Sequence, residues 1–121
     1  MKSAVRAAHT MTVQRHGGSV GIRDEGLVDS ALTRPLNLYH YEDCTDLSRL
    51  AAAYAAGIIQ NYSFIDGNKR VGFASAVVFL DLNDVTLTAD EVSATAMTLS
   101  FAAGEIEEAN YAAWLGQNSD T

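Results

Sequence analysis

A ten-residue polar stretch constrains this chain more than any other feature, because it separates two long apolar segments: Asn61-Tyr62-Ser63-Phe64-Ile65-Asp66-Gly67-Asn68-Lys69-Arg70. Lys69 and Arg70 are two of only 8 basic residues, and they stand directly before a helix-like run. The first backbone N–H groups of a helix and the positive end of its dipole attract an anion. Gly67 lets the backbone approach such a group closely, and Asp66 is a candidate ligand for the magnesium ion of a nucleotide. The stretch therefore predicts a phosphate site at the start of a helix.

The length and composition predict one domain over residues 1–121 that lies in the cytoplasm. A hydrophobic content of 48% with a single proline argues against disorder. No apolar run reaches the roughly 18 residues of a membrane span. Residues 1–10 lack the apolar core of a signal peptide. Cys44 is the only cysteine, which excludes an internal disulfide and fits a reducing compartment.

The formal net charge of −7 disfavours direct nucleic-acid binding, which needs a basic surface. A negative protein still binds a nucleotide through one local positive site, and it suits a partner with a basic or amphipathic segment. The three histidines show no metal-ligand spacing, and the sequence contains no P-loop motif. Neither a histidine metal site nor a P-loop therefore competes with the site around Lys69.

Hydrophobic spacing predicts helices along most of the chain. We expect a first helix over residues 3–15, ended by the breakers His16-Gly17-Gly18. A short second helix is expected to open at Asp24 or Glu25 and to stop at Pro35.

The segment 36–43 is expected to be irregular or briefly extended, and its Tyr39 and Tyr41 make it a candidate flap over a site. Thr45 is the expected N-cap of the next helix, which runs to about residue 60.

The run after the polar stretch, residues 68–82, is apolar all round and fits a central helix surrounded by others. A turn and a short extended piece follow over 83–87. Thr88 to Glu91 has the capping-box pattern, and Gly104 is a natural stop for the helix that it opens. The apolar face expected for that helix is Val92, Ala96, Leu99 and Ala103.

A last helix is expected over residues 107–115, with a frayed tail over 116–121. The pattern as a whole predicts an all-α domain of about six helices around a central apolar helix.

The polar stretch resembles the active-site motif of the Fic/Doc (Fido) superfamily, which reads roughly His-x-Phe-x-(Asp/Glu)-(Gly/Ala)-Asn-(Gly/Lys)-Arg. Phe64 and Asp66 through Arg70 fall in place, whereas the family's histidine is Tyr62 here. Lys69 stands where AMP-transferring Fic enzymes usually carry glycine, which points to the death-on-curing (Doc) toxin branch. Weaker similarity spans nearly the whole chain, including the segment Ala31-Leu32-Thr33-Arg34-Pro35.

This resemblance implies the toxin of a toxin–antitoxin pair, a kinase-like enzyme that moves the γ-phosphate of ATP to a threonine of elongation factor Tu and so blocks translation. ATP and Mg²⁺ are the implied cofactors, and a cognate antitoxin is the implied partner. On the matching positions, Asp66 would contact the metal or orient the substrate, and Gly67, Asn68, Lys69 and Arg70 would hold the phosphates.

Tyr62 is the departure that bears most on activity. The family's histidine takes the proton of the target hydroxyl, whereas tyrosine has a pKa of about 10 and is a poor base at neutral pH. Loss of a general base costs about 10²- to 10⁴-fold in rate. We therefore expect this chain to bind nucleotide and to transfer phosphate very weakly. Tyr62 is either an engineered substitution that disarms a toxin, which we favour, or a natural variant.

Three other interpretations stay open. Asp66-Gly67-Asn68 taken alone also suits an ordinary turn with a helix cap, although Phe64 before it and Lys69-Arg70 after it favour the active-site interpretation. The function could also be AMP transfer to a protein hydroxyl, against which Lys69 counts. A non-catalytic module that binds nucleotide and antitoxin is the third possibility, and Tyr62 supports it.

Overall fold

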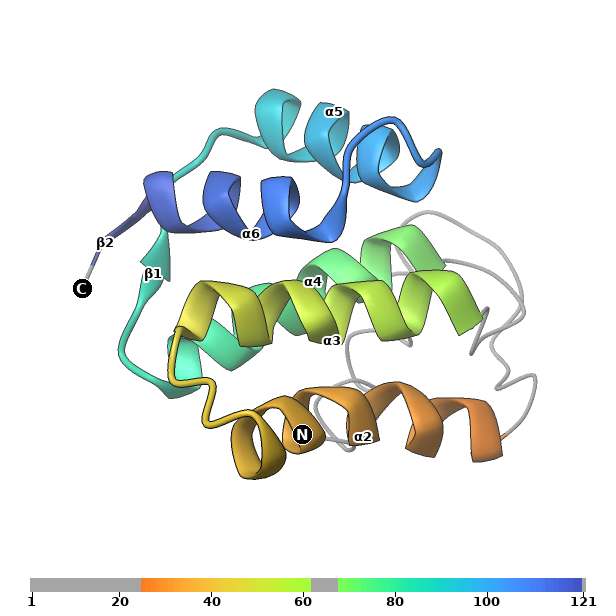
Figure 1. Ribbon diagram of the computed structural model, residues 1–121. Helices are drawn as coiled ribbons and strands as arrows, with labels where there is room; N and C mark the ends of the chain where they lie inside the picture. The colour runs from red at the N-terminus through yellow and green to blue at the C-terminus, as the bar shows by residue number, and fades with distance from the viewer. Residues whose placement is uncertain (1–24, 62–67, 121) are drawn as a thin grey trace.

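Helices make up most of the chain in the computed structural model, which describes residues 25–61 and 68–120 (Figure 1). The expected all-α class is confirmed. None of the described helices is both long and apolar enough to cross a bilayer. The expected helix over 3–15 lies outside the described residues. In chain order the elements are α2 (Glu25–Tyr41), α3 (Leu47–Asn61), α4 (Asn68–Leu82), β1 (Thr86–Leu87), α5 (Glu91–Ala102), α6 (Glu108–Gln117) and β2 (Ser119–Asp120).

Helix α3 lies at the centre of these elements, with α2 on one side and α6 on the other (Figure 1). Every residue from 51 to 59 is buried. Most of them are alanines, whose small side chains let neighbouring helices approach from several sides. The expected central helix, 68–82, has the bounds of α4, but its Val77 and Val78 stay half-buried. The centre is therefore the alanine-rich helix and not the one with the larger apolar side chains.

The expectation that Pro35 ends a helix is wrong, because α2 continues through it to Tyr41. Proline removes the N–H that would bond to the carbonyl of Ala31. Both Ala31 and Pro35 are buried, and the Ala31 carbonyl lies against Gly57 of α3. Packing on α3 thus holds a helix that local propensity would end. The expected flap over 36–43 is largely the last turns of α2, with Tyr39 53% exposed on it.

Aspartates, not the expected threonines, cap α3 and α5. The Asp46 carboxylate accepts a hydrogen bond from the backbone N–H of Ser48 at 3.0 Å. Asp90 does the same for Ser93 at 2.7 Å, and this bond lowers the pKa of its carboxyl. Each aspartate directly precedes the first helical residue. From that position a side-chain oxygen reaches the first backbone N–H groups of the helix, which have no acceptor within the helix itself. Thr45 and the capping box at Thr88 were therefore placed slightly too early.

The apolar face expected for α5 is also wrong. The structure buries Ala94, Thr98 and Phe101 and leaves Val92 80% exposed and Leu99 48% exposed. The helix is apolar on both sides, so its spacing does not determine which side packs inward. Phe101 decides the orientation, because its ring stacks on Tyr111 of α6 with centroids 4.6 Å apart.

The C-terminal tail is ordered where fraying was expected. Strand β2 pairs antiparallel with β1, with Leu87 opposite Ser119. The Thr88 backbone N–H and hydroxyl both donate to the Asn118 carbonyl, at 2.6 and 2.9 Å. Gly104, with φ of 79°, follows α5 as the expected stop, and α6 confirms the last expected helix.

Candidate functional site

The first turn of α4 is the described part of the predicted phosphate site. Asn68, Lys69 and Arg70 are its first three residues, as the motif predicts. Asn68 is half-buried, and the two cationic side chains are exposed. The remaining predicted site residues lie outside the described part of the chain, so their roles stay predictions: Tyr62, Asp66 and Gly67.

The electrostatics of this turn favour an anion. The N-terminal end of a helix carries the positive end of its dipole, where acidic side chains are stabilising and cations are not. The first turn of α4 carries Lys69 and Arg70 and no acidic residue. A bound polyphosphate would neutralise both charges and accept hydrogen bonds from backbone N–H groups of the turn. The residues present therefore fit the phosphates of a nucleotide.

Close packing holds this turn in place against α3. A Cβ on Gly72 would lie 2.7 Å from the Ile59 side chain and 3.1 Å from the Ala55 carbonyl oxygen, so only glycine allows this approach. Val71 beside it is fully buried. Figure 1 shows that α3 ends and α4 begins at the same end of the molecule, where α2 also begins. The cations of α4 are thus carried on a rigid helix.

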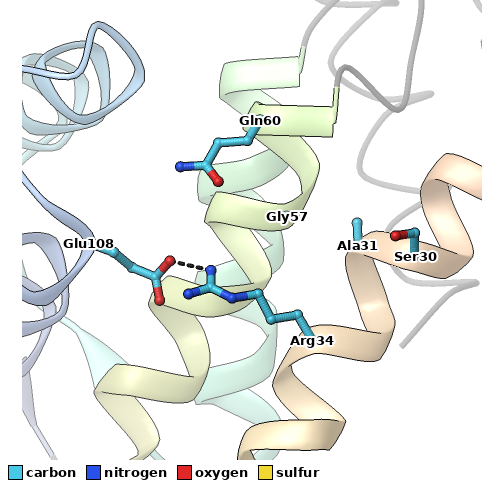
Figure 2. A pocket seen from close by; sticks show the side chains of 6 residues that line it. All are labelled: Ser30, Ala31, Arg34, Gly57, Gln60 and Glu108. Carbon is cyan, nitrogen blue, oxygen red and sulfur yellow. Dashed lines mark hydrogen bonds and ion pairs between the residues drawn. The ribbon is translucent and has the colours of Figure 1, made fainter.

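A polar pocket of about 340 Å³ opens at this end, between α2, α3 and the start of α6 (Figure 2). Arg34 of α2 pairs with Glu108 of α6 on one side, and the Gln60 side chain projects from the last turn of α3. Gly57 keeps that part of α3 close to α2. The lining residues are Ser30, Ala31, Arg34, Gly57, Gln60 and Glu108.

The sequence analysis did not predict this pocket. Arg34 and Glu108 are 74 positions apart, and no local pattern connects them. The one available signal was that Arg34 stands in a segment similar to Doc-type proteins. Gln60 lies two positions before Tyr62, so the pocket adjoins the motif in sequence.

The described residues do not form a second candidate metal site. Within residues 25–61 and 68–120, no group of three or more histidine, cysteine or acidic side chains is arranged to hold a metal ion. Cys44 is buried near the start of α3. Asp66, the expected metal ligand, is not among the described residues.

The chain belongs to the Fic/DOC family, whose sequence profile matches residues 2–80. Two relatives place it with the Doc-type members. It is 32% identical over 106 residues to the protein of Escherichia phage P1 called "Protein kinase doc", across 88% of this chain and 83% of the phage protein. It is 40% identical over 75 residues to "Toxin Doc" of Mycolicibacterium smegmatis, across 61% of this chain and 58% of that toxin. The predicted resemblance to Doc-type members of the Fic/Doc superfamily is confirmed.

Proposed function

We propose that this chain is a Doc-type toxin whose site transfers phosphate from ATP to a protein hydroxyl. The observation that carries the proposal is the first turn of α4, where Lys69 and Arg70 meet the positive end of a helix whose first turn carries no acidic residue. Membership of the Fic/DOC family supports it, as do the names of the two relatives, one a kinase and the other a toxin.

In this proposal the described residues bind and orient the phosphates. Asn68 and the backbone N–H groups of the turn donate to phosphate oxygens, while Lys69 and Arg70 offset charge that builds up during transfer. Gly67 would leave the backbone open to the anion, and Asp66 would hold Mg²⁺. The nucleotide supplies the γ-phosphate. The proposed acceptor is a threonine of elongation factor Tu, whose modification would stop translation.

Tyr62 limits what this chain does by itself. A neutral phenol is a weak acceptor for the proton of the target hydroxyl, so the proposal includes a loss of about 10²- to 10⁴-fold in rate against a histidine at that position. Nucleotide binding does not need this base. The chain is therefore proposed to bind ATP and to transfer its phosphate very slowly.

Tyr62 also favours a second candidate function. A chain that lacks the base and keeps the cations would serve as a non-catalytic module that binds nucleotide and an antitoxin. AMP transfer is the remaining alternative, and Lys69 counts against it. In each case the proposed protein partner is the cognate antitoxin of a toxin–antitoxin pair.

The test compares the chain as given with its Tyr62→His variant. Each is incubated with purified elongation factor Tu, Mg²⁺ and ATP labelled at either the γ- or the α-phosphate. The proposal expects γ-label on the factor with the histidine variant and at most a trace with the chain as given. Transfer of the α-label would establish AMP transfer instead.

Binding is measured separately by calorimetry with ATP and Mg²⁺. Arg70→Gln should weaken ATP binding about tenfold, the size of one lost charge-assisted contact. Arg49→Gln is the matched control, because Arg49 is an exposed arginine in the first turn of another helix. If ATP binds but neither version of the chain transfers label, the binding-module function is favoured.

A further inference from the structure

Helix α5 presents an uncovered apolar stripe to solvent. Val92 is 80% exposed and Leu99 is 48% exposed, and Ala96 between them is exposed as well. They line a shallow depression of about 440 Å³ together with Glu91 and Thr95. In Figure 1, α5 lies at the outer edge of the molecule, on the far side of α6 from α2. A single exposed leucine is ordinary in a folded protein, but a continuous apolar stripe marks an interaction site.

The spacing of the stripe is that of a helix–helix seam. Val92, Ala96, Leu99 and Ala103 follow one another at intervals of four, three and four residues, which is the a/d repeat of paired helices. The opposite face of α5, through Thr98 and Phe101, is already packed against α6. The helix therefore has two apolar faces, and only one is covered within the described part of the chain.

The charged residues that neighbour the stripe in the sequence have one sign. After Arg70 the sequence contains no lysine, arginine or histidine, so all the charged side chains beyond it are acidic. Asp90 and Glu91 stand at one end of the stripe, and the exposed Glu105 stands just past the other. The last turn of α5 carries no basic residue, so no cation of that turn offsets the negative end of its dipole. The acidic residues after Arg70 are Asp81, Asp84, Asp90, Glu91, Glu105, Glu107, Glu108 and Asp120.

We propose that the stripe, defined as Val92, Ala96, Leu99 and Ala103, docks an amphipathic helix with basic flanks from a partner protein. The heptad spacing selects a helix as the occupant, and the acidic ends select lysine and arginine beside the apolar seam of that helix. A second copy of this chain is a poor occupant, because it would bring the same acidic side chains to the contact. The stripe lies on α5, outside residues 2–80 that the family profile matches, and it shares no residue with the phosphate site on α4.

The probe is a synthetic three-heptad peptide with a leucine seam and lysine and arginine flanks. Its twin has the same seam with glutamate flanks, and a third peptide has the basic composition in scrambled order. Each is titrated into the full chain, with methyl signals of Val92 and Leu99 observed by NMR. We expect saturable shifts of both residues with the basic peptide, binding at least about tenfold weaker with the acidic twin, and weakening with salt.

Two variants locate the contact. Val92→Ser with Leu99→Ser should weaken binding of the basic peptide about tenfold or more, since it removes the apolar anchors without touching the buried face. Leu82→Ser is the matched control, because Leu82 is 66% exposed on α4 and outside the stripe. The control should bind as tightly as the unaltered chain, and circular dichroism should be the same for all three proteins.

Three outcomes would overturn the proposal. The first is equal binding of the basic and scrambled peptides, which would reduce the interaction to charge alone. The second is a dimer in sedimentation experiments that dissociates in the Val92→Ser, Leu99→Ser variant, which would make a second copy the occupant. The third is a set of nuclear Overhauser contacts between Val92 and a distant segment of the same chain in the free protein.

Discussion

At the scale of single residues, the two cations of the phosphate site lie where they destabilise the helix that carries them. Lys69 and Arg70 lie at the positive end of α4 with no acidic residue in the turn. Arg49 occupies a comparable place in α3, but there the Asp46 carboxylate caps the helix and offsets the charge, at 3.4 Å from the Arg49 backbone N–H. The first turn of α4 itself carries no carboxylate that offsets its two cations, which suits an anionic ligand.

Lys69→Gln should therefore stabilise the free protein and weaken nucleotide binding. Removal of the cation from the helix N-terminus should raise the free energy of unfolding by about 0.3–1 kcal/mol at low ionic strength. The same change should weaken ATP binding about tenfold, since it removes a charge-assisted contact to phosphate. Urea unfolding and calorimetry measure the two effects. Arg49→Gln should change both quantities less, and a Lys69→Gln protein that loses stability would contradict the charge argument.

The stability of the fold also depends on the buried hydroxyl of Tyr111. Tyr111 is fully buried, and Thr98 Oγ1 lies 2.9 Å from its hydroxyl. Thr98→Val keeps the shape and leaves that hydroxyl without this partner, which should cost about 1–3 kcal/mol in urea unfolding. The double variant with Tyr111→Phe removes both polar groups and should recover part of the loss. No recovery in the double variant would mean that the loss came from packing and not from the hydrogen bond.

At the scale of elements, two glycines set how closely helices approach. A Cβ on Gly57 would lie 2.7 Å from the Ala31 carbonyl oxygen and 2.9 Å from its Cα, both of which are backbone atoms that cannot rotate away. A Cβ on Gly116 of α6 would meet only the Ser48 side chain, at 2.9 Å to its Oγ. The first position is closed to a larger residue, and the second is not.

Gly57→Ala should destabilise the fold although alanine is the better helix former. The gain in helix propensity is about 1 kcal/mol, whereas separating α2 from α3 should cost more than that, for a net loss of about 1–2 kcal/mol. Gly116→Ala is the matched substitution, and it should be neutral or stabilising. Thermal unfolding of the two variants checks this. A more stable Gly57→Ala protein would show that α2 can move away without cost.

The helices themselves were largely predictable, but their ends and faces were not. The bounds of α4 follow from its apolar run, because length and composition both favour a helix there. The continuation of α2 through Pro35 depends on the packing of Ala31 against Gly57, a contact between residues 26 positions apart that no local pattern contains. The inward face of α5 depends on where Phe101 finds Tyr111.

The candidate site, like the fold, was predictable from the sequence only in part. The cations at the start of α4 were predicted correctly, because the signal lies in consecutive residues of one motif. The Arg34–Glu108 pair was not predicted, since it joins the first described helix to the last one along the chain. Contacts made by distant segments are set by the fold as a whole and not by the sequence near either partner.

At the scale of the whole molecule, the aromatic core links α5 and α6 to stability at high pH. Tyr111 stacks on Phe101 with centroids 4.6 Å apart and on Trp114 at 5.9 Å. Burial raises the pKa of Tyr111 to about 12, although its hydrogen bond with Thr98 opposes the shift. Burial also raises the pKa of Tyr54 in α3. Both phenols are therefore more strongly protonated in the folded state than in the unfolded chain.

This difference predicts an alkaline loss of stability with a defined window. An unfolded tyrosine releases its proton near pH 10, whereas Tyr111 holds its proton until about pH 12. Between these values the folded state binds more protons, so the free energy of unfolding falls as pH rises, by about 2–3 kcal/mol in total. Below pH 10 both states are protonated and this contribution does not vary. Urea unfolding at intervals from pH 8 to pH 12 measures the decline.

Tyr111→Phe identifies the source of that decline. The variant lacks the phenol, so its stability should fall less between pH 10 and pH 12 than that of the unaltered chain, even if it is less stable at neutral pH. Lysine titration contributes little in this window, because the sequence contains only Lys2 and Lys69. Parallel curves for the two proteins would assign the alkaline loss to other groups, with Tyr54 the next to test. A shallower curve for Tyr111→Phe would show that contact between α5 and α6 limits the stability of the whole fold at high pH.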